Sequence, residues 1–101
     1  MMRIAFRPEA RSEAFSAQNW YESRALGLGL EFARALEVAL ASAVRNPQAY
    51  SLVEGACRRV LLRKFPFSLI YRADTEVLVV VAVFHHRREP LALVARTDKE
   101  S

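Results

Sequence analysis

The sequence contains few of the residues that cross-link or interrupt a fold. Only one of its 101 residues is cysteine, three are glycine and four are proline. The lone Cys57 excludes an internal disulfide, and no CxxC pair is present to hold a metal, so we expect a reducing, cytoplasmic setting with no metal and no cofactor. We interpret Cys57 as a small buried hydrophobic residue rather than a nucleophile, because no histidine or acid stands at motif spacing from it.

Long apolar runs are also missing. None approaches the roughly 18 residues that a membrane span requires. The first 20 residues carry five charged side chains and no apolar run, which argues against a secretory signal. A hydrophobic share of 52% excludes disordered and collagen-like classes. Two domains would each be too small to hold a core, so we predict a single domain over residues 1–101, with the tail from about residue 91 less well defined.

Positive charge is concentrated in the second half of the chain. Residues 1–50 hold six basic and five acidic side chains, whereas residues 58–88 hold seven basic and two acidic ones. A surface of this sign attracts polyanions and acidic proteins alike, so it predicts the charge of a partner and not its identity.

The first half of the chain predicts a strand and two helices. Residues 2–7 form a β-favouring run that ends at Pro8, and a helix begins there with small residues on one face. Gly27 and Gly29 interrupt the helical pattern. A second helix follows up to Asn46-Pro47, with an unbroken apolar row at every fourth position: Leu28, Phe32, Leu36, Leu40 and Val44. Two such helices joined by a short turn are expected to pack as an antiparallel hairpin.

The second half changes to alternating, aromatic and β-branched sequence. After a polar loop, it predicts strands over residues 58–65, 67–72 and 77–85, joined by tight connections at Pro66 and residues 73–76. The order is β-α-α-β-β-β, an α+β fold with a helical hairpin packed on a small antiparallel sheet. The last strand is apolar on both faces, with Val79, Val81 and Val83 opposite Leu78, Val80 and Ala82. The hairpin covers one face only, so something else is expected to cover the second.

The sequence "VVVAVFHHRREP" ends this last strand with two histidines and two arginines. His85 and His86 point to opposite faces of a regular strand, so we do not expect them to share a metal ion. One reading is that a histidine packs at the strand end while Arg87 and Arg88 are solvated. The other is that Arg87 or Arg88 contacts a phosphate or an acidic surface. The candidate target-binding residues are Arg59, Arg63, Arg72, His85, His86, Arg87 and Arg88.

The order of elements, together with "RNPQAY", "RRVLLRKFPFSLIYR" and "VVVAVFHHRREP", resembles the RelE/ParE family of toxins from type II toxin–antitoxin systems, also known as plasmid stabilisation proteins. The resemblance covers Ile4 to about Pro90. It implies a growth-inhibiting toxin that an acidic antitoxin, encoded beside it, holds inactive by wrapping around it. The target that the family implies is either DNA gyrase or mRNA on the ribosome.

The residues favour the gyrase branch. The mRNA-cutting branch implies basic residues on the second and third strands, an arginine after the last strand and an aromatic hydroxyl near the C-terminus. The matching positions here are Arg59, Leu61, Ser68, Arg88 and Val94, so most of that set is absent. We therefore lean away from an enzyme and predict ParE-like inhibition by protein contact, with ribosome-dependent mRNA cleavage as the alternative. A basic RNA-binding module without toxicity ranks last, because Phe65, Phe67 and Tyr71 alternate as core residues do.

Overall fold

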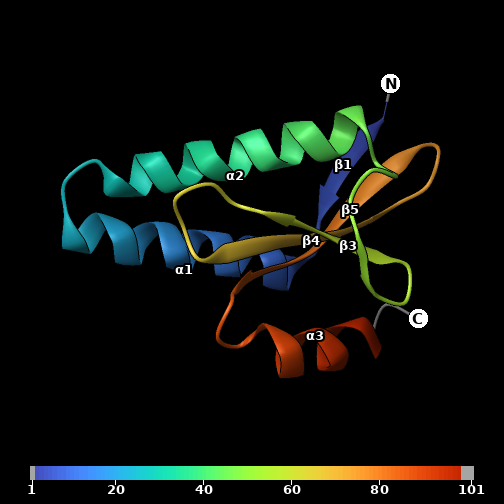
Figure 1. Cartoon of the computed structure of the whole chain (residues 1–101). Coiled ribbons are helices and arrows are strands. Elements are labelled where there is room, and N and C mark those ends of the chain that lie inside the picture. The colour runs from blue at the N-terminus through green and yellow to red at the C-terminus, as the bar shows by residue number, and fades with distance from the viewer. Residues whose placement is uncertain (1, 99–101) are drawn as a thin grey trace.

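The computed structural model describes residues 2–98, so Met1 and residues 99–101 of the predicted domain lie outside the described part. Residues 2–98 form three helices and one five-stranded sheet, with the strands in the order β1-β5-β4-β3-β2. The elements follow one another as β1 (Arg3–Phe6), α1 (Pro8–Arg24), α2 (Leu28–Arg45), β2 (Leu52–Glu54), β3 (Cys57–Leu61), β4 (Phe67–Ala73), β5 (Val77–His85) and α3 (Glu89–Asp98). The sheet lies between α2 on one side and α3 on the other (Figure 1). Within residues 2–98 no helix has the length and apolar character that a membrane span requires.

The helical hairpin forms as the sequence predicts. Pro8 begins α1 and needs no hydrogen-bond partner there, since its ring nitrogen carries no hydrogen. Gly27 turns the chain with a φ of 88°, a conformation that disfavours residues with a Cβ. Gly29 lets the helices approach, because a Cβ on it would lie 2.7 Å from the carbonyl oxygen of Gln18. The Glu22 carboxylate accepts hydrogen bonds of 2.9 Å from the backbone N–H groups of Gly27 and Gly29, which fixes the turn.

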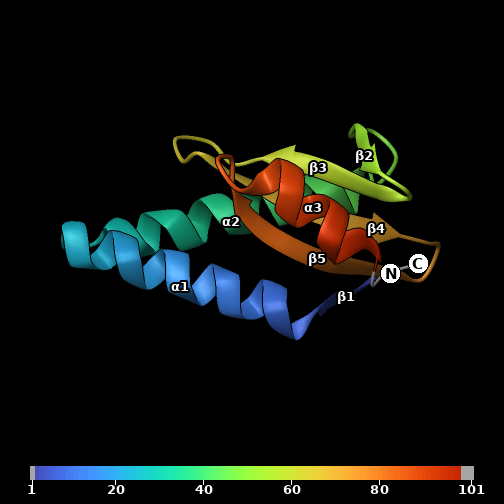
Figure 2. The ribbon, with the colours of Figure 1, turned by 90° about the horizontal axis from the view of Figure 1, so that it is seen from below.

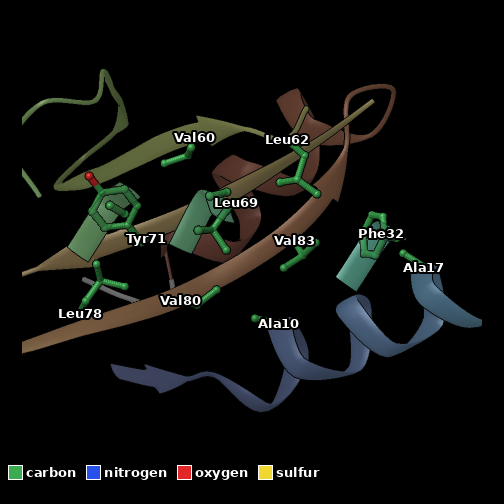
Figure 3. Packing of buried hydrophobic residues seen from close by; sticks show 12 residues of the cluster. Ala10, Ala17, Phe32, Val60, Leu62, Leu69, Tyr71, Leu78, Val80 and Val83 are labelled. Atoms are coloured by element: carbon green, nitrogen blue, oxygen red, sulfur yellow. The ribbon is translucent and has the colours of Figure 1, made fainter. Parts of the chain in front are cut away.

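The main core lies between this hairpin and one face of the sheet. Side chains from β3, β4 and β5 point toward the helices, among them Val60, Leu69 and Val80 (Figure 3). Phe32 is fully buried, and its ring packs against three other rings with centroids 5.1–5.4 Å away: Tyr21, Phe65 and Phe67. The predicted core role of the aromatic residues around Pro66 is therefore confirmed. Tyr71 is also buried, and its hydroxyl donates a 2.7 Å hydrogen bond to the carbonyl oxygen of Pro47.

A bulge in β5 changes the predicted faces of that strand. The pairing of β4 with β5 shifts between Ile70 and Tyr71, which leaves Val81 as an extra residue. As a result Val83 joins Val80 in the hairpin-side core, while Ala82 joins Val81 on the other face. The strict alternation expected from the sequence was wrong from residue 82 onward, because a bulge reverses the faces of the residues that follow it.

The second face of the sheet is covered by the chain itself. Helix α3 packs over β5, and Leu93 joins a second cluster with Ile70, Val81 and Phe84 (Figure 2). We expected a covering element from elsewhere and did not predict this helix. Pro90 stands in its first turn, where proline is compatible with a helix, so it begins α3 instead of only ending the strand.

The sheet differs from the expectation in two further details. β1 pairs in parallel with β5, so the sheet is mixed, and a short β2 lies within the loop predicted as polar. The predicted strand over residues 58–65 ends at Leu61, because Lys64 has a φ of 69° and Pro66 follows. The α+β class and the predicted order of the six elements are confirmed.

Candidate functional site

Most of the candidate residues lie at one end of the sheet. β3 and β5 are both antiparallel to β4, so their C-terminal ends lie together. Arg63 follows β3, His85 is the last residue of β5, and residues 86–88 follow it. Arg72, near the C-terminal end of β4, is at the opposite end of the sheet, so the structure does not bring it into this group.

The two histidines at the end of β5 make different contacts. The His85 ring packs edge-on against Phe67 with centroids 5.2 Å apart, and its Nδ1 accepts a 3.0 Å hydrogen bond from the backbone N–H of Arg87. His86 is exposed, and its backbone N–H donates to the carbonyl oxygen of Pro66 at 2.9 Å. His85 therefore has a structural role in ordering the turn. Within residues 2–98 no group of three potential ligands is placed to hold a metal ion.

Arg88 contacts its own chain more than Arg87 does. The guanidinium of Arg88 lies 5.1 Å from the centroid of the Phe84 ring and 3.9 Å from a carboxylate oxygen of Glu13. Its side chain is still 57% exposed, so these contacts are weak. Both arginines remain accessible to a partner.

Arg59 forms an ion pair that the sequence did not reveal. It lies on the α3 face of β3, and its guanidinium donates a hydrogen bond to Oε2 of Glu89 in the first turn of α3. Glu89 is buried, and its second oxygen, Oε1, has no hydrogen-bond partner. The charge of Arg59 is thus largely matched within the chain, which reduces its attraction for a phosphate.

The positions that correspond to the mRNA-cutting branch lie on this same face. Leu61 pairs with Ser68, two residues from Arg59 along the strand. Ser68 is fully buried, and its hydroxyl has no hydrogen-bond partner. Val94 is on α3 and is partly exposed. Leu61, Ser68 and Val94 supply no group that could take up or deliver a proton to a substrate, and the carboxylate near them on this face, that of Glu89, is paired with Arg59.

A second polar network holds α3 and was missed by sequence reasoning. Glu13 of α1 accepts a hydrogen bond from the backbone N–H of Val83 at 3.1 Å and from the Arg96 guanidinium at 2.7 Å. Arg96 in turn donates to the carbonyl oxygen of Val81 at 2.9 Å. β1 pairs with β5 only as far as Val80. Beyond that point, the side chains of Glu13 and Arg96 form the hydrogen bonds that a neighbouring strand would otherwise form with β5. Residues so far apart in the sequence leave no local signal of this contact.

A groove runs between α2 and the outer edge of β3. Val38 of α2, which is more than half exposed, lies in its apolar lining, and Leu61 borders it at the edge of β3. The charged residues that line it are Arg34, Arg63 and Lys64 together with Glu31; Arg59 also borders it, but its guanidinium is paired with Glu89 on the other face of the sheet. We name this the α2–β3 groove. It combines exposed apolar surface with an excess of positive charge, as a docking site for an acidic partner would.

Comparison with known proteins agrees with this architecture. A solved structure described as the chromosomal ParDE TA system from P. aeruginosa matches with a TM-score of 0.60 and 14% sequence identity, covering 84% of this chain and 96% of that one. At this identity the match shows the fold alone. A search of curated proteins found no significant match. The family model described as the ParE toxin of the type II toxin-antitoxin system, parDE, matches residues 4–90. The chain therefore belongs to the ParE family of type II toxin–antitoxin toxins.

Proposed function

We propose that this chain is the toxin of a type II toxin–antitoxin pair and that it inhibits growth in the cytoplasm by protein contact with DNA gyrase. An acidic antitoxin, encoded by the neighbouring gene, binds it and suppresses this activity. The antitoxin part of the proposal is supported by family membership and by the basic, partly apolar α2–β3 groove.

The observation that favours protein contact over mRNA cleavage is the ion pair between Arg59 and Glu89. In the nuclease branch the arginine at this strand position would bind the RNA phosphate, but here its guanidinium is hydrogen-bonded to Glu89 of the same chain. General acid and base groups contribute roughly 10²–10⁴-fold to such a reaction, and Leu61 and Ser68 offer none. The exposed residues Arg63, Arg87 and Arg88 remain available for contact with a protein surface.

Two assays on the purified, partner-free protein test the proposal. We expect it to inhibit supercoiling by DNA gyrase and to leave mRNA intact on translating ribosomes. Adding the product of the neighbouring gene should restore supercoiling. The Arg87→Ala/Arg88→Ala variant, checked for unchanged folding, should inhibit gyrase less than the unmodified chain does.

Opposite results would refute the proposal in separate parts. Codon-specific mRNA cleavage that disappears in Arg88→Ala would place the chain in the nuclease branch. Inhibition of neither target, together with normal growth on induced expression, would contradict the toxin assignment. RNA binding without growth inhibition would support the non-toxic RNA-binding module instead.

A further inference from the structure

Glu89 is a buried carboxylate with an incomplete set of hydrogen bonds. Its side chain is 7% exposed, its Oε2 accepts a hydrogen bond from Arg59, and its Oε1 has no partner among residues 2–98. A buried oxygen without a partner costs about 1–3 kcal/mol, and a buried ion pair is often no more stabilising than apolar side chains of similar size. Stability alone therefore does not account for a glutamate at this position.

The surroundings of this carboxylate are basic. The side chain of Arg59 is 40% exposed, so it is accessible from solvent beside α3. Arg87 and Arg88, both exposed, directly precede Glu89 in the chain. The Ser68 hydroxyl lies on the same face of the sheet, buried and without a hydrogen-bond partner in the described part of the chain. Guanidinium groups and a hydroxyl donor are the groups that bind a phosphodiester.

The Glu89 carboxylate competes with any phosphate for Arg59. Carboxylate and phosphate oxygens bind a guanidinium in the same way, through charge-assisted N–H···O hydrogen bonds. Glu89 also lies in the first turn of α3, where the helix dipole favours a negative charge. A phosphate of RNA would have to displace the carboxylate from both interactions and would be repelled by its charge. The glutamate therefore penalises the binding of a nucleic acid more than that of a protein surface.

We propose that Glu89 is a selectivity residue, whose carboxylate excludes the phosphodiester backbone of nucleic acids from Arg59 and so leaves the exposed Arg87 and Arg88 to a protein partner. Selectivity of this kind comes from weakening the wrong complex. The inference rests on the proposed function, because it explains how a basic chain favours a protein target over RNA. Its test measures RNA binding alone.

The test uses a fluorescently labelled 12-nucleotide single-stranded RNA and the purified, partner-free chain. Fluorescence anisotropy measures the dissociation constant. Glu89→Gln removes the charge and keeps both the shape and an acceptor oxygen for Arg59. We expect it to bind the RNA at least ~10-fold more tightly than the unmodified chain does, because Arg59 becomes available to a phosphate. The slope of log affinity against log salt concentration should steepen by about 0.7, the value for one added phosphate contact of a single strand.

Two matched variants separate the charge of Glu89 from other effects. Glu9→Gln makes the same change in net charge at an exposed position of α1 and should raise RNA affinity less than ~3-fold, since exposed charges are screened by salt. Arg59→Gln/Glu89→Gln has the net charge of the unmodified chain and should bind RNA as weakly as that chain. Both changes at position 89 remove the same carboxylate, so any loosening of α3 affects the two variants equally and their difference reports on Arg59.

The outcomes separate this inference from the proposed function. A gain in RNA affinity in Glu89→Gln that disappears in Arg59→Gln/Glu89→Gln supports the inference. No gain in Glu89→Gln, a gain no larger than that of Glu9→Gln, or a gain that persists in the double variant would each overturn it. Inhibition of gyrase by the unmodified chain is measured separately, and its absence would refute the proposed function without changing the result for Glu89.

Discussion

Glu13 should contribute more to the free energy of unfolding than an exposed helical glutamate does. Its carboxylate is the acceptor for the N–H of Val83 and for the Arg96 guanidinium, and its side chain is only 14% exposed. Changing Glu13 to Ala leaves a buried backbone donor unbonded, which costs about 1–3 kcal/mol. It also leaves Arg96, 13% exposed, without its counter-charge. Breaking a fully buried ion pair costs about 3–5 kcal/mol.

Both side chains keep some contact with solvent, so the total is expected at about 2–4 kcal/mol. Glu13→Gln keeps an acceptor for Val83 but loses the charge, and should cost about 1–2 kcal/mol. The measurement is urea unfolding followed by circular dichroism, supported by Tm. In a domain of this size each kcal/mol corresponds to about 4–8 °C.

The control is Glu9→Ala, an exposed carboxylate one turn earlier in α1. It should cost less than about 1 kcal/mol, since it loses only a favourable interaction with the helix dipole. Amide exchange provides a local readout, because α3 depends on Glu13 through Arg96. The amides of α3 should exchange faster in Glu13→Ala than in Glu9→Ala. Equal stability of the two variants, with α3 equally protected, would refute the assigned role of Glu13.

Three further predictions follow from the described contacts. Arg87→Ala/Arg88→Ala should lower the free energy of unfolding by no more than about 1 kcal/mol, because the Arg88 side chain is 57% exposed. Urea unfolding measures this change, and a variant that fails to fold would show that the two arginines support the fold. Gly29→Ala should cost about 1–3 kcal/mol in the same assay, because its Cβ would lie 2.7 Å from the Gln18 carbonyl oxygen, and an unchanged Tm would contradict that close packing. Burial raises the pKa of Tyr71, so its hydroxyl is held neutral in the folded state and stability should fall as the pH rises above the ordinary value of 10. Tyr71→Phe should lose about 0.5–1.5 kcal/mol at pH 7, with its hydrogen bond to Pro47, and should show a shallower alkaline decline in a pH series of unfolding curves.

The elements with strong local patterns could be predicted from the sequence. The apolar row of α2 and the turn at Gly27 define the helical hairpin, and the alternating stretches define β4 and β5. Helix α3 carried a readable signal as well, since Glu89 and Pro90 are typical of a first helical turn. Pro8 begins α1 and Pro90 stands in the first turn of α3, so proline marks the start of both helices, although the sequence analysis predicts only the first of them.

The bulge in β5 and the ion pairs have a different origin. Which residues of β5 face the hairpin depends on the register with β4, and no local pattern in "VVVAVF" marks Val81 as the extra residue. Arg59 and Glu89 are 30 residues apart, and Glu13 and Arg96 are 83 apart. Pairing over such distances is decided by the tertiary fold. The sequence therefore identified Arg59 as a candidate but could not show that its charge is matched within the chain.

Most of helix α3, which covers the second face of the sheet, lies beyond the region that the family model matches. The match ends at residue 90, whereas the helix that covers this face runs from Glu89 to Asp98. Its attachment uses three residues inside the matched region, Glu13, Arg59 and Glu89, and one beyond it, Arg96. Family membership alone therefore does not imply that this face is closed. Helix α3 covers Val81 and Phe84 of β5, whereas Arg63, Arg87 and Arg88 at the strand ends stay exposed, so a partner of this chain can reach these three arginines with α3 in place.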